Sequence, residues 1–223
     1  MTQFTAQKIL FDLDGTLVDT APDLHAATNH TLQTIDRPPV PIDAVRHMTG
    51  FGAVKLIETA LETTGGIEGY DFAKLRDVFL EYYSENICVH SALYPYCLDM
   101  LKQLGGAGFQ LAVCTNKPIG LAVPLLEKLE IYSLFGAVTG GDSYSFKKPD
   151  PRHIQKTAEL LPGHGPALMV GDASPDILGA QAASIPVIAV DYGYADQPIE
   201  ALKPNHIIGS LADLPALLRL PTA

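Results

Sequence analysis

The chain has 223 residues, of which 47% are hydrophobic and 18% charged, so it can bury a core and is not a disordered chain. Its formal net charge is −10 with no basic run to contact phosphates, which argues against a nucleic-acid partner. It has three cysteines without a CxxC pair, no signal-peptide pattern and no apolar stretch of the roughly 18 residues that span a bilayer. We therefore expect reduced thiols, a cytoplasmic location and no membrane partner, while monomer and dimer both stay open.

The first predicted strand is the apolar run Ile9–Leu13, and two carboxylates, Asp12 and Asp14, stand at its end. Side chains two positions apart in a strand point to the same side, so these carboxylates would leave the strand together. Two adjacent anions at the end of a buried strand need a compensating cation. Ligand sites of open α/β sheets lie at that edge, so the sequence predicts a site here.

Residues 20–88 show helical patterns without an intervening strand. Breakers such as Gly65-Gly separate four predicted helices, which are Asp23–Thr34, Ile42–Met48, Val54–Thr63 and Phe72–Asn86. The sequence therefore predicts an all-helical unit, residues 20–88, inserted after the first strand. The chain would return through about Val89–Tyr96.

Strand-like and helix-like segments alternate after residue 100. The strand-like runs are Gln110–Cys114, Ala137–Thr139, Ala167–Val170 and Val187–Val190. The helix-like segments between them are Pro118–Leu129, Pro151–Leu161 and Pro175–Ala183. This alternation predicts an α/β fold with parallel strands joined by crossover helices, and the continuous apolar runs fit a sheet covered on both faces. Residues 1–19 and 89–223 would form this core.

Reactive side chains follow four of the predicted strands. They are Asp12 with Asp14, Thr115 with Asn116, Lys148 within Lys147-Lys-Pro-Asp-Pro, and Asp172 with Asp176. One parallel sheet would bring these strand ends to one edge. The set fits phosphoryl transfer, in which catalysis is mostly positioning and charge neutralisation.

The carboxylates divide naturally between covalent, proton-transfer and metal-binding roles. Asp12 can attack phosphorus to form an aspartyl-phosphate, which splits one difficult step into two. Asp14 can protonate the leaving oxygen and later deprotonate the attacking water. Asp172 and Asp176 would complete an oxygen shell for Mg²⁺, which screens the nucleophile from the phosphate and holds them in line.

The remaining side chains of the set are suited to binding the phosphate group of the substrate. Lys148 adds positive charge to the phosphate oxygens and tethers Asp12, and Pro149 keeps the Lys148 backbone extended. The Thr115 hydroxyl and the Asn116 amide donate to the phosphate oxygens.

Simpler interpretations stay open for three of these residues. Asp14, followed by glycine, also fits a turn. Asp176 also fits a helix start, with Ser174 as N-cap and Pro175 at the first helical position. Thr115 also fits an ordinary hydroxyl at a strand end.

Four motifs in order over residues 9–183 resemble those of the haloacid dehalogenase-like superfamily in its phosphatase form. They are Asp12-Leu-Asp-Gly-Thr-Leu-Val-Asp-Thr, Thr115-Asn116, Lys148-Pro149, and Gly171-Asp172 with Asp176. The resemblance implies a doubly wound, Rossmann-like core and identifies the inserted helical unit as a type 1 cap. It also implies that Mg²⁺ binds Asp12, the backbone carbonyl of Asp14, and Asp172.

Secondary matches resemble the phosphoglycolate phosphatases of this superfamily. They are Gly15-Thr-Leu-Val-Asp-Thr-Ala-Pro-Asp-Leu, Asp191-Tyr-Gly-Tyr, and Arg46-His-Met-Thr-Gly-Phe-Gly, which resembles a cap loop that contacts substrate. The resemblance implies substrate contacts from Arg46, Gly50, Phe51 and Gly52. The Arg46 guanidinium would match a carboxylate, although an exposed arginine at a helix end is the alternative. Ala173 departs from relatives, which often carry a hydroxyl there.

These observations predict a Mg²⁺-dependent phosphatase for a small anionic phosphorylated substrate, with 2-phosphoglycolate as the first candidate. A phosphatase for a sugar phosphate, a nucleotide or pyrophosphate stays open, as does a phosphomutase. Dehalogenase chemistry is disfavoured because it has no need for Mg²⁺ or its carboxylates. A non-catalytic binding protein is disfavoured because clustered carboxylates are costly to bury.

Overall fold

A six-stranded parallel sheet forms the core of the computed structural model, which describes residues 3–46 and 52–220. Its strand order is β6-β5-β2-β7-β8-β9. The strands are β2 (Lys8–Phe11), β5 (Gln110–Cys114), β6 (Ala137–Thr139), β7 (Ala167–Gly171), β8 (Val187–Val190) and β9 (His206–Ile208). Every neighbouring pair is parallel, which confirms the predicted sheet and places β2 in its interior.

Both faces of this sheet are buried. In β2, Ile9 and Phe11 join the larger apolar cluster with Leu101, whereas Leu10 joins a second cluster with Ile154. Successive side chains of a strand point to opposite faces, so an uninterrupted apolar run is what a doubly covered strand requires.

Helices cover the sheet on both sides. Those of the core are α5 (Cys97–Gly106), α6 (Ile119–Lys128), α7 (Pro151–Leu160) and α8 (Ser174–Ala182). Helices α5 and α6 pack on the face that carries the larger cluster, and α7 and α8 pack on the other face. The core is therefore doubly wound, as the resemblance implies.

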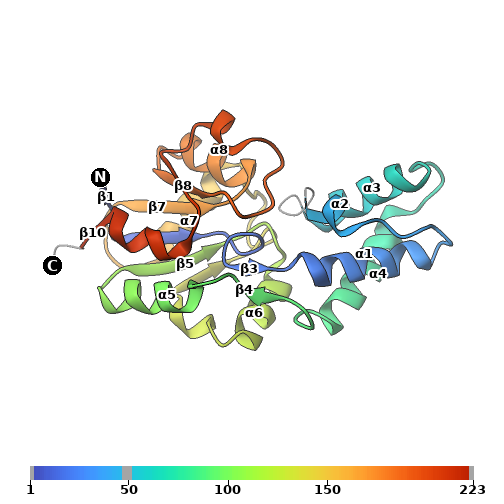
Figure 1. Cartoon of the computed structure of the whole chain (residues 1–223), viewed down its shortest axis with the longest axis horizontal. Coiled ribbons are helices and arrows are strands. Elements are labelled where there is room, and N and C mark those ends of the chain that lie inside the picture. The colour runs from blue at the N-terminus through green and yellow to red at the C-terminus, as the bar shows by residue number, and fades with distance from the viewer. Residues whose placement is uncertain (1–2, 47–51, 221–223) are drawn as a thin grey trace.

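Four helices form a separate unit at one end of the molecule (Figure 1). They are α1 (Ala21–Gln33), α2 (Ile42–Arg46), α3 (Ala53–Thr64) and α4 (Phe72–Glu85). They pack against one another around buried side chains that include Leu61 and Phe79. The all-helical cap is thus present, and its boundaries at residues 20 and 88 stay a prediction. The expected extension of the second helix to Met48 lies outside the described residues.

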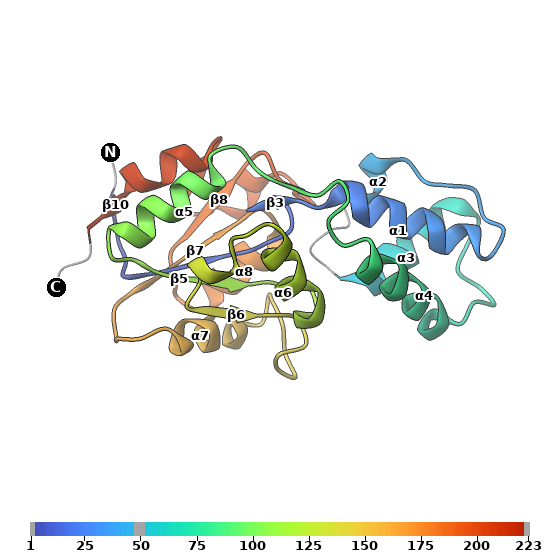
Figure 2. The ribbon, with the colours of Figure 1, turned by 90° about the horizontal axis from the view of Figure 1, so that it is seen from below.

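Two short segments join the cap to the core, as both views show (Figures 1 and 2). Strand β3 (Val18–Asp19) pairs antiparallel with β4 (Ala92–Leu93) where the chain leaves and re-enters the core. The buried Asp23 carboxylate of α1 accepts hydrogen bonds from the backbone N–H groups of Val89, His90 and Ser91 and from the Ser91 hydroxyl. The two connections are therefore tied to each other.

Several elements have no counterpart among the predicted ones. They are α5, β3, β4 and β9, the pair β1 (Phe4–Thr5) with β10 (Leu218–Arg219), and the 3₁₀ helices Tyr132–Leu134, Ile199–Leu202 and Leu211–Leu217. Two-residue strands are too short to show an alternation. Helix α5 could have been predicted from the sequence, because its buried residues Cys97, Leu101 and Leu104 recur at helical spacing. None of the helices in the described residues combines the length and apolar character that crossing a bilayer requires.

Candidate active site

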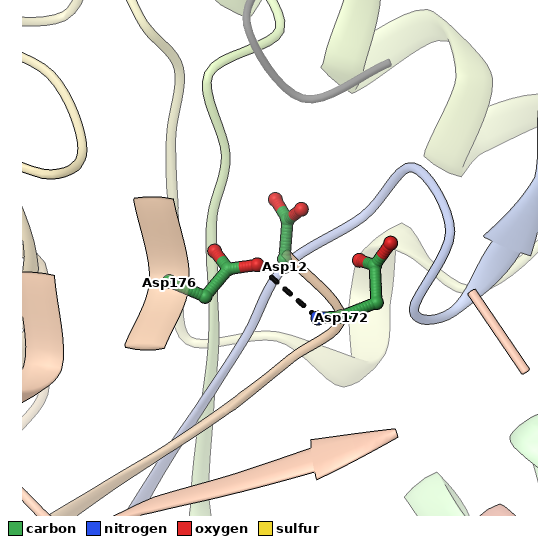
Figure 3. Close-up of side chains that lie close together, drawn as sticks. All are labelled: Asp12, Asp172 and Asp176. Carbon is green, nitrogen blue, oxygen red and sulfur yellow. Dashed lines mark hydrogen bonds between the residues drawn. The ribbon is translucent and has the colours of Figure 1, made fainter. Parts of the chain in front are cut away.

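Three buried carboxylates converge at the carboxyl edge of the sheet (Figure 3). Asp12 directly follows β2 and Asp172 directly follows the neighbouring β7, while Asp176 lies in the first turn of α8. One carboxylate oxygen from each residue lies within 4.8 Å of the others. All three side chains are almost inaccessible to solvent, with relative exposures of 4%, 1% and 1%.

Lys148 is the cation in contact with this cluster. Its Nζ lies 2.8 Å from Asp12 Oδ1 and 2.5 Å from Asp176 Oδ1. Burial opposes the charge on Lys148, but the two carboxylates outweigh it and raise its pKa. When all three carboxylates are ionised, they carry two more negative charges than this one ammonium can neutralise.

Burial, and then repulsion between the carboxylates, raise the pKa values of Asp12 and Asp172. Burial, and then the charge of Asp176, raise the pKa of Asp12 to about 7, although Lys148 opposes both effects. Burial and then the neighbouring Asp176 and Asp12 raise the pKa of Asp172. Carboxylate oxygens in this arrangement are suitable ligands for a divalent cation, and such an ion would supply the missing charge.

The surrounding loops orient Asp172. Its Oδ1 accepts a hydrogen bond from Thr16 Oγ1 at 2.7 Å, and its Oδ2 accepts one from the Tyr194 backbone N–H at 2.7 Å. Gly15 packs beside it with φ of +86°, and a Cβ on Gly15 would lie 2.3 Å from Asp172 Oδ2. Glycine is therefore required there both for its backbone conformation and for space.

Asp176 holds the turn before α8 as well as facing the cluster. Its Oδ2 accepts hydrogen bonds from the backbone N–H groups of Asp172 and Ala173, both at 3.2 Å. Helix α8 begins at Ser174, with Ala173 as its N-cap, so the alternative that placed Ser174 at the N-cap is wrong. The Asp176 side chain thus accepts the backbone N–H of the N-cap residue, while the Ala173 side chain makes no capping bond of its own.

Thr115 and Asn116 follow β5, the strand on the other side of β2. Thr115 Oγ1 accepts a hydrogen bond from the Lys117 backbone N–H at 3.2 Å. Asn116 Nδ2 donates to the backbone carbonyl of Lys148 at 2.9 Å, which links two of the motif segments. Both side chains are buried, and their contacts with a phosphate stay a prediction.

Comparisons with known proteins agree with this arrangement. Residues 9–190 match the family described as haloacid dehalogenase-like hydrolase. The chain belongs to this family.

Relatives within the family are similar over almost the whole chain. A phosphoglycolate phosphatase of Agrobacterium fabrum is 44% identical over 212 residues, which cover 93% of this chain and 91% of that protein. A phosphoglycolate phosphatase of Caulobacter vibrioides is 39% identical over 209 residues, which cover 93% of this chain and 88% of that protein. A crystal structure of a predicted phosphoglycolate phosphatase from Haemophilus somnus has a TM-score of 0.87 and 33% identity, covering 97% of this chain and 99% of that one.

Asp14 is placed differently from Asp12, although the two belong to the same motif. Its side chain is outside the acidic cluster and pairs with Lys117, whose Nζ lies 2.9 Å from Oδ1 and 3.2 Å from Oδ2. Lys117 also donates to the Tyr83 hydroxyl of α4 at 2.7 Å. The sequence-based reasoning missed Lys117, although it directly follows Thr115 and Asn116 at the end of a buried strand.

A second missed residue supports Lys148. His153 is fully buried in α7, where its Nδ1 accepts a hydrogen bond from the Lys148 backbone N–H at 3.3 Å. Its Nε2 lies 3.1 Å from Thr139 Oγ1. Burial, and then the Lys148 charge, lower the pKa of His153 to about 4, so the ring is neutral at neutral pH and able to accept this bond.

A pocket between the cap and the core opens onto the site. Its polar wall comes from the core, with Asp12, Asp14, Thr115, Asn116 and Lys117. Its other lining residues include Gly52 and apolar side chains of the cap, namely Leu24, Ala53, Leu56, Phe79 and Leu80, with Tyr83 beside them. The cap thus closes a charged site with an apolar wall.

The expected cap-loop contacts are only partly within the described residues. Gly52 lines the pocket and stands at the N-cap of α3, whereas Gly50 and Phe51 lie outside the described residues. The half-exposed Arg46 side chain lies 3.8 Å from both Asp19 and Asp43 and does not line this pocket. A role for Arg46 in substrate binding stays a prediction.

Proposed function

We propose that this protein is a Mg²⁺-dependent phosphatase that hydrolyses 2-phosphoglycolate through an aspartyl-phosphate on Asp12. The observation that carries this proposal is the buried cluster of Asp12, Asp172 and Asp176, which Lys148 only partly neutralises. Relatives 44% and 40% identical that are named phosphoglycolate phosphatases support the choice of substrate.

In the first half-reaction, a carboxylate oxygen of Asp12 attacks phosphorus. A bond forms between this oxygen and phosphorus, and the bond between phosphorus and the ester oxygen breaks. Asp14, in its protonated form, gives its proton to the departing oxygen, so that the alcohol leaves as glycolate.

In the second half-reaction, water attacks the phosphorus of the aspartyl-phosphate. Asp14, now a carboxylate, takes a proton from this water, and the bond from Asp12 to phosphorus breaks to release inorganic phosphate. Both catalytic carboxylates are then regenerated in their starting forms.

Seven residues would hold the ion and the phosphate while these steps occur. Asp12, Asp172 and Asp176, with the backbone carbonyl of Asp14, would hold Mg²⁺, which neutralises phosphate charge and aligns the attack. Lys148 would neutralise the remaining charge on the phosphate. The Thr115 hydroxyl and an Asn116 N–H would donate to its oxygens.

The test is phosphate release by the wild-type protein and by Asp12→Asn in the presence of Mg²⁺. We expect the wild type to hydrolyse 2-phosphoglycolate faster than a sugar phosphate, a nucleotide or pyrophosphate. Asp12→Asn should lose turnover because an amide is a poor nucleophile, while its nearly unchanged volume preserves the fold. The exposed Asp213→Asn is the matched control and should keep full activity.

Two outcomes would contradict the proposal. Full activity of Asp12→Asn would remove Asp12 as the nucleophile. A rate for 2-phosphoglycolate far below those for the other esters would reject this substrate while leaving a phosphatase of the same family.

A further inference from the structure

The pocket over the site contains a cation that the steps above do not use. Among the described residues that line it, Lys117 is the one lysine or arginine. Lys148 pairs with Asp12 and Asp176 and does not line the pocket, and Arg46 pairs with Asp19 and Asp43. We propose that Lys117 binds the carboxylate of the substrate and so selects phosphorylated acids over neutral phosphate esters. This inference rests on the proposed function.

The position of Lys117 beside Asp14 fits this role. Its Nζ lies 2.9 Å from Asp14 Oδ1, and Asp14 is the group that would protonate the ester oxygen. In a phosphorylated 2-hydroxy acid, the carboxylate carbon is only two bonds from that oxygen. A substrate whose ester oxygen contacts Asp14 therefore brings its carboxylate close to Lys117.

Lys117 has both the charge and the hydrogen-bonding capacity for a second anion. An ammonium has three N–H donors, and the two oxygens of one carboxylate can share a single donor. Asp14 and the Tyr83 hydroxyl then occupy two donors, which leaves one for a ligand. Burial opposes the charge on Lys117, but Asp14 and Tyr83 outweigh it and raise its pKa, so it is an ammonium at neutral pH.

The cap holds Lys117 in this position. Tyr83 of α4 is 1% exposed, and its ring centroid lies 4.6 Å from Lys117 Nζ. Burial raises the pKa of Tyr83 to about 12, so the hydroxyl is neutral and adds no competing charge. The rest of the cap wall is apolar, with Leu24, Leu56 and Phe79, so a short acid whose carboxylate reaches Lys117 fits this wall.

The test compares 2-phosphoglycolate with phosphoglycolamide, in which a neutral amide replaces the carboxylate. We expect the wild type to prefer the acid by about 10- to 100-fold in kcat/KM, as a charge-assisted hydrogen bond would give. Lys117→Gln should lose most of this preference, mainly through KM for the acid. Lys117→Arg should keep part of it because the positive charge remains, and the exposed control Lys128→Gln should keep all of it.

Binding of the products separates this inference from the proposed function. Calorimetric titration of the wild type in Mg²⁺ should show glycolate binding at least about tenfold tighter than glycolamide, whether or not the protein hydrolyses either ester. This measurement also holds if Lys117→Gln fails to fold. Equal binding of glycolate and glycolamide would overturn the inference, as would an equal loss of kcat/KM for both esters in Lys117→Gln, which would leave Lys117 only an orienting role for Asp14.

Discussion

His153 shows how a single buried side chain can make the site sensitive to pH. Its ring accepts a hydrogen bond from the Lys148 backbone and must be neutral to do so. The charged groups that act on it are Lys148, which lowers its pKa, and Asp150, which raises it by a smaller amount.

We expect the free energy of unfolding to fall as the pH decreases from about 6.5 to about 4, in part because of His153. Between these values the unfolded chain binds a proton on His153 that the folded protein does not, so acid favours unfolding by roughly 2 kcal/mol. Urea unfolding across this range should show a shallower decline for His153→Asn than for the wild type. For the exposed control His164→Asn, the free energy of unfolding should fall with decreasing pH as steeply as for the wild type. An unchanged slope in His153→Asn would contradict the role of His153.

Some residues of the site can be recognised from the local sequence, and others only from contacts in the folded protein. Asp12, Asp172 and Lys148 each follow a strand or precede a helix in a local pattern, so their importance is visible from their neighbours in sequence. Lys117 and His153 act through contacts with Tyr83 and Thr139, which lie 34 and 14 positions away. No local periodicity predicts such contacts.

At the scale of elements, Asp23 ties the two connections between cap and core. It belongs to α1, directly after the first connection, and its carboxylate accepts four groups of the second connection at 2.7–3.0 Å. Because this carboxylate is 2% exposed, water does not replace these bonds.

Asp23→Ala should destabilise the protein by about 2–4 kcal/mol, because it leaves several buried N–H groups without an acceptor. Urea unfolding measures the change in free energy of unfolding. Asp23→Asn should lower the free energy of unfolding by less than Asp23→Ala, since its amide oxygen still accepts one or two of these hydrogen bonds. The exposed Glu81→Ala of α4 should change stability by less than about 0.5 kcal/mol. A similarly small change in Asp23→Ala would show that the tie between the connections adds little.

The long elements of the core were predictable because their patterns are strong. Residues Gln110–Cys114 and Val187–Val190 are continuous apolar runs between breakers, and both are strands with these bounds. The ribbon of β3 and β4 was not predictable, since its two-residue strands are stabilised by pairing with each other rather than by a sequence pattern.

At the scale of the molecule, the uncompensated charge of the cluster couples metal binding to stability. A divalent ion that binds the folded protein alone stabilises it by about 2.7 kcal/mol at one hundred times its Kd. The three carboxylates assemble only when β2, β7 and α8 pack together, so the unfolded chain lacks this site.

We therefore expect Mg²⁺ to raise the Tm of the protein in a concentration-dependent way, and EDTA to reverse the shift and abolish phosphate release. Thermal unfolding followed by circular dichroism measures the first effect independently of activity. Asp172→Asn should weaken the Mg²⁺-dependent shift because one ligand charge is lost, whereas Asp213→Asn should retain it. A Tm that Mg²⁺ does not change would argue against a divalent site at this cluster.

The sequence by itself determined the class of fold, the family and the residues of the four motifs. These depend on local patterns, namely apolar runs that end in charged side chains and turns that require glycine or proline. The tertiary structure alone decided that Asp14 pairs with Lys117, that Ala173 and not Ser174 is the N-cap of α8, and that an apolar cap wall faces the charged edge of the sheet. The physical reason is that these contacts join distant segments, and their energies depend on burial and distance, which exist only once the chain has folded.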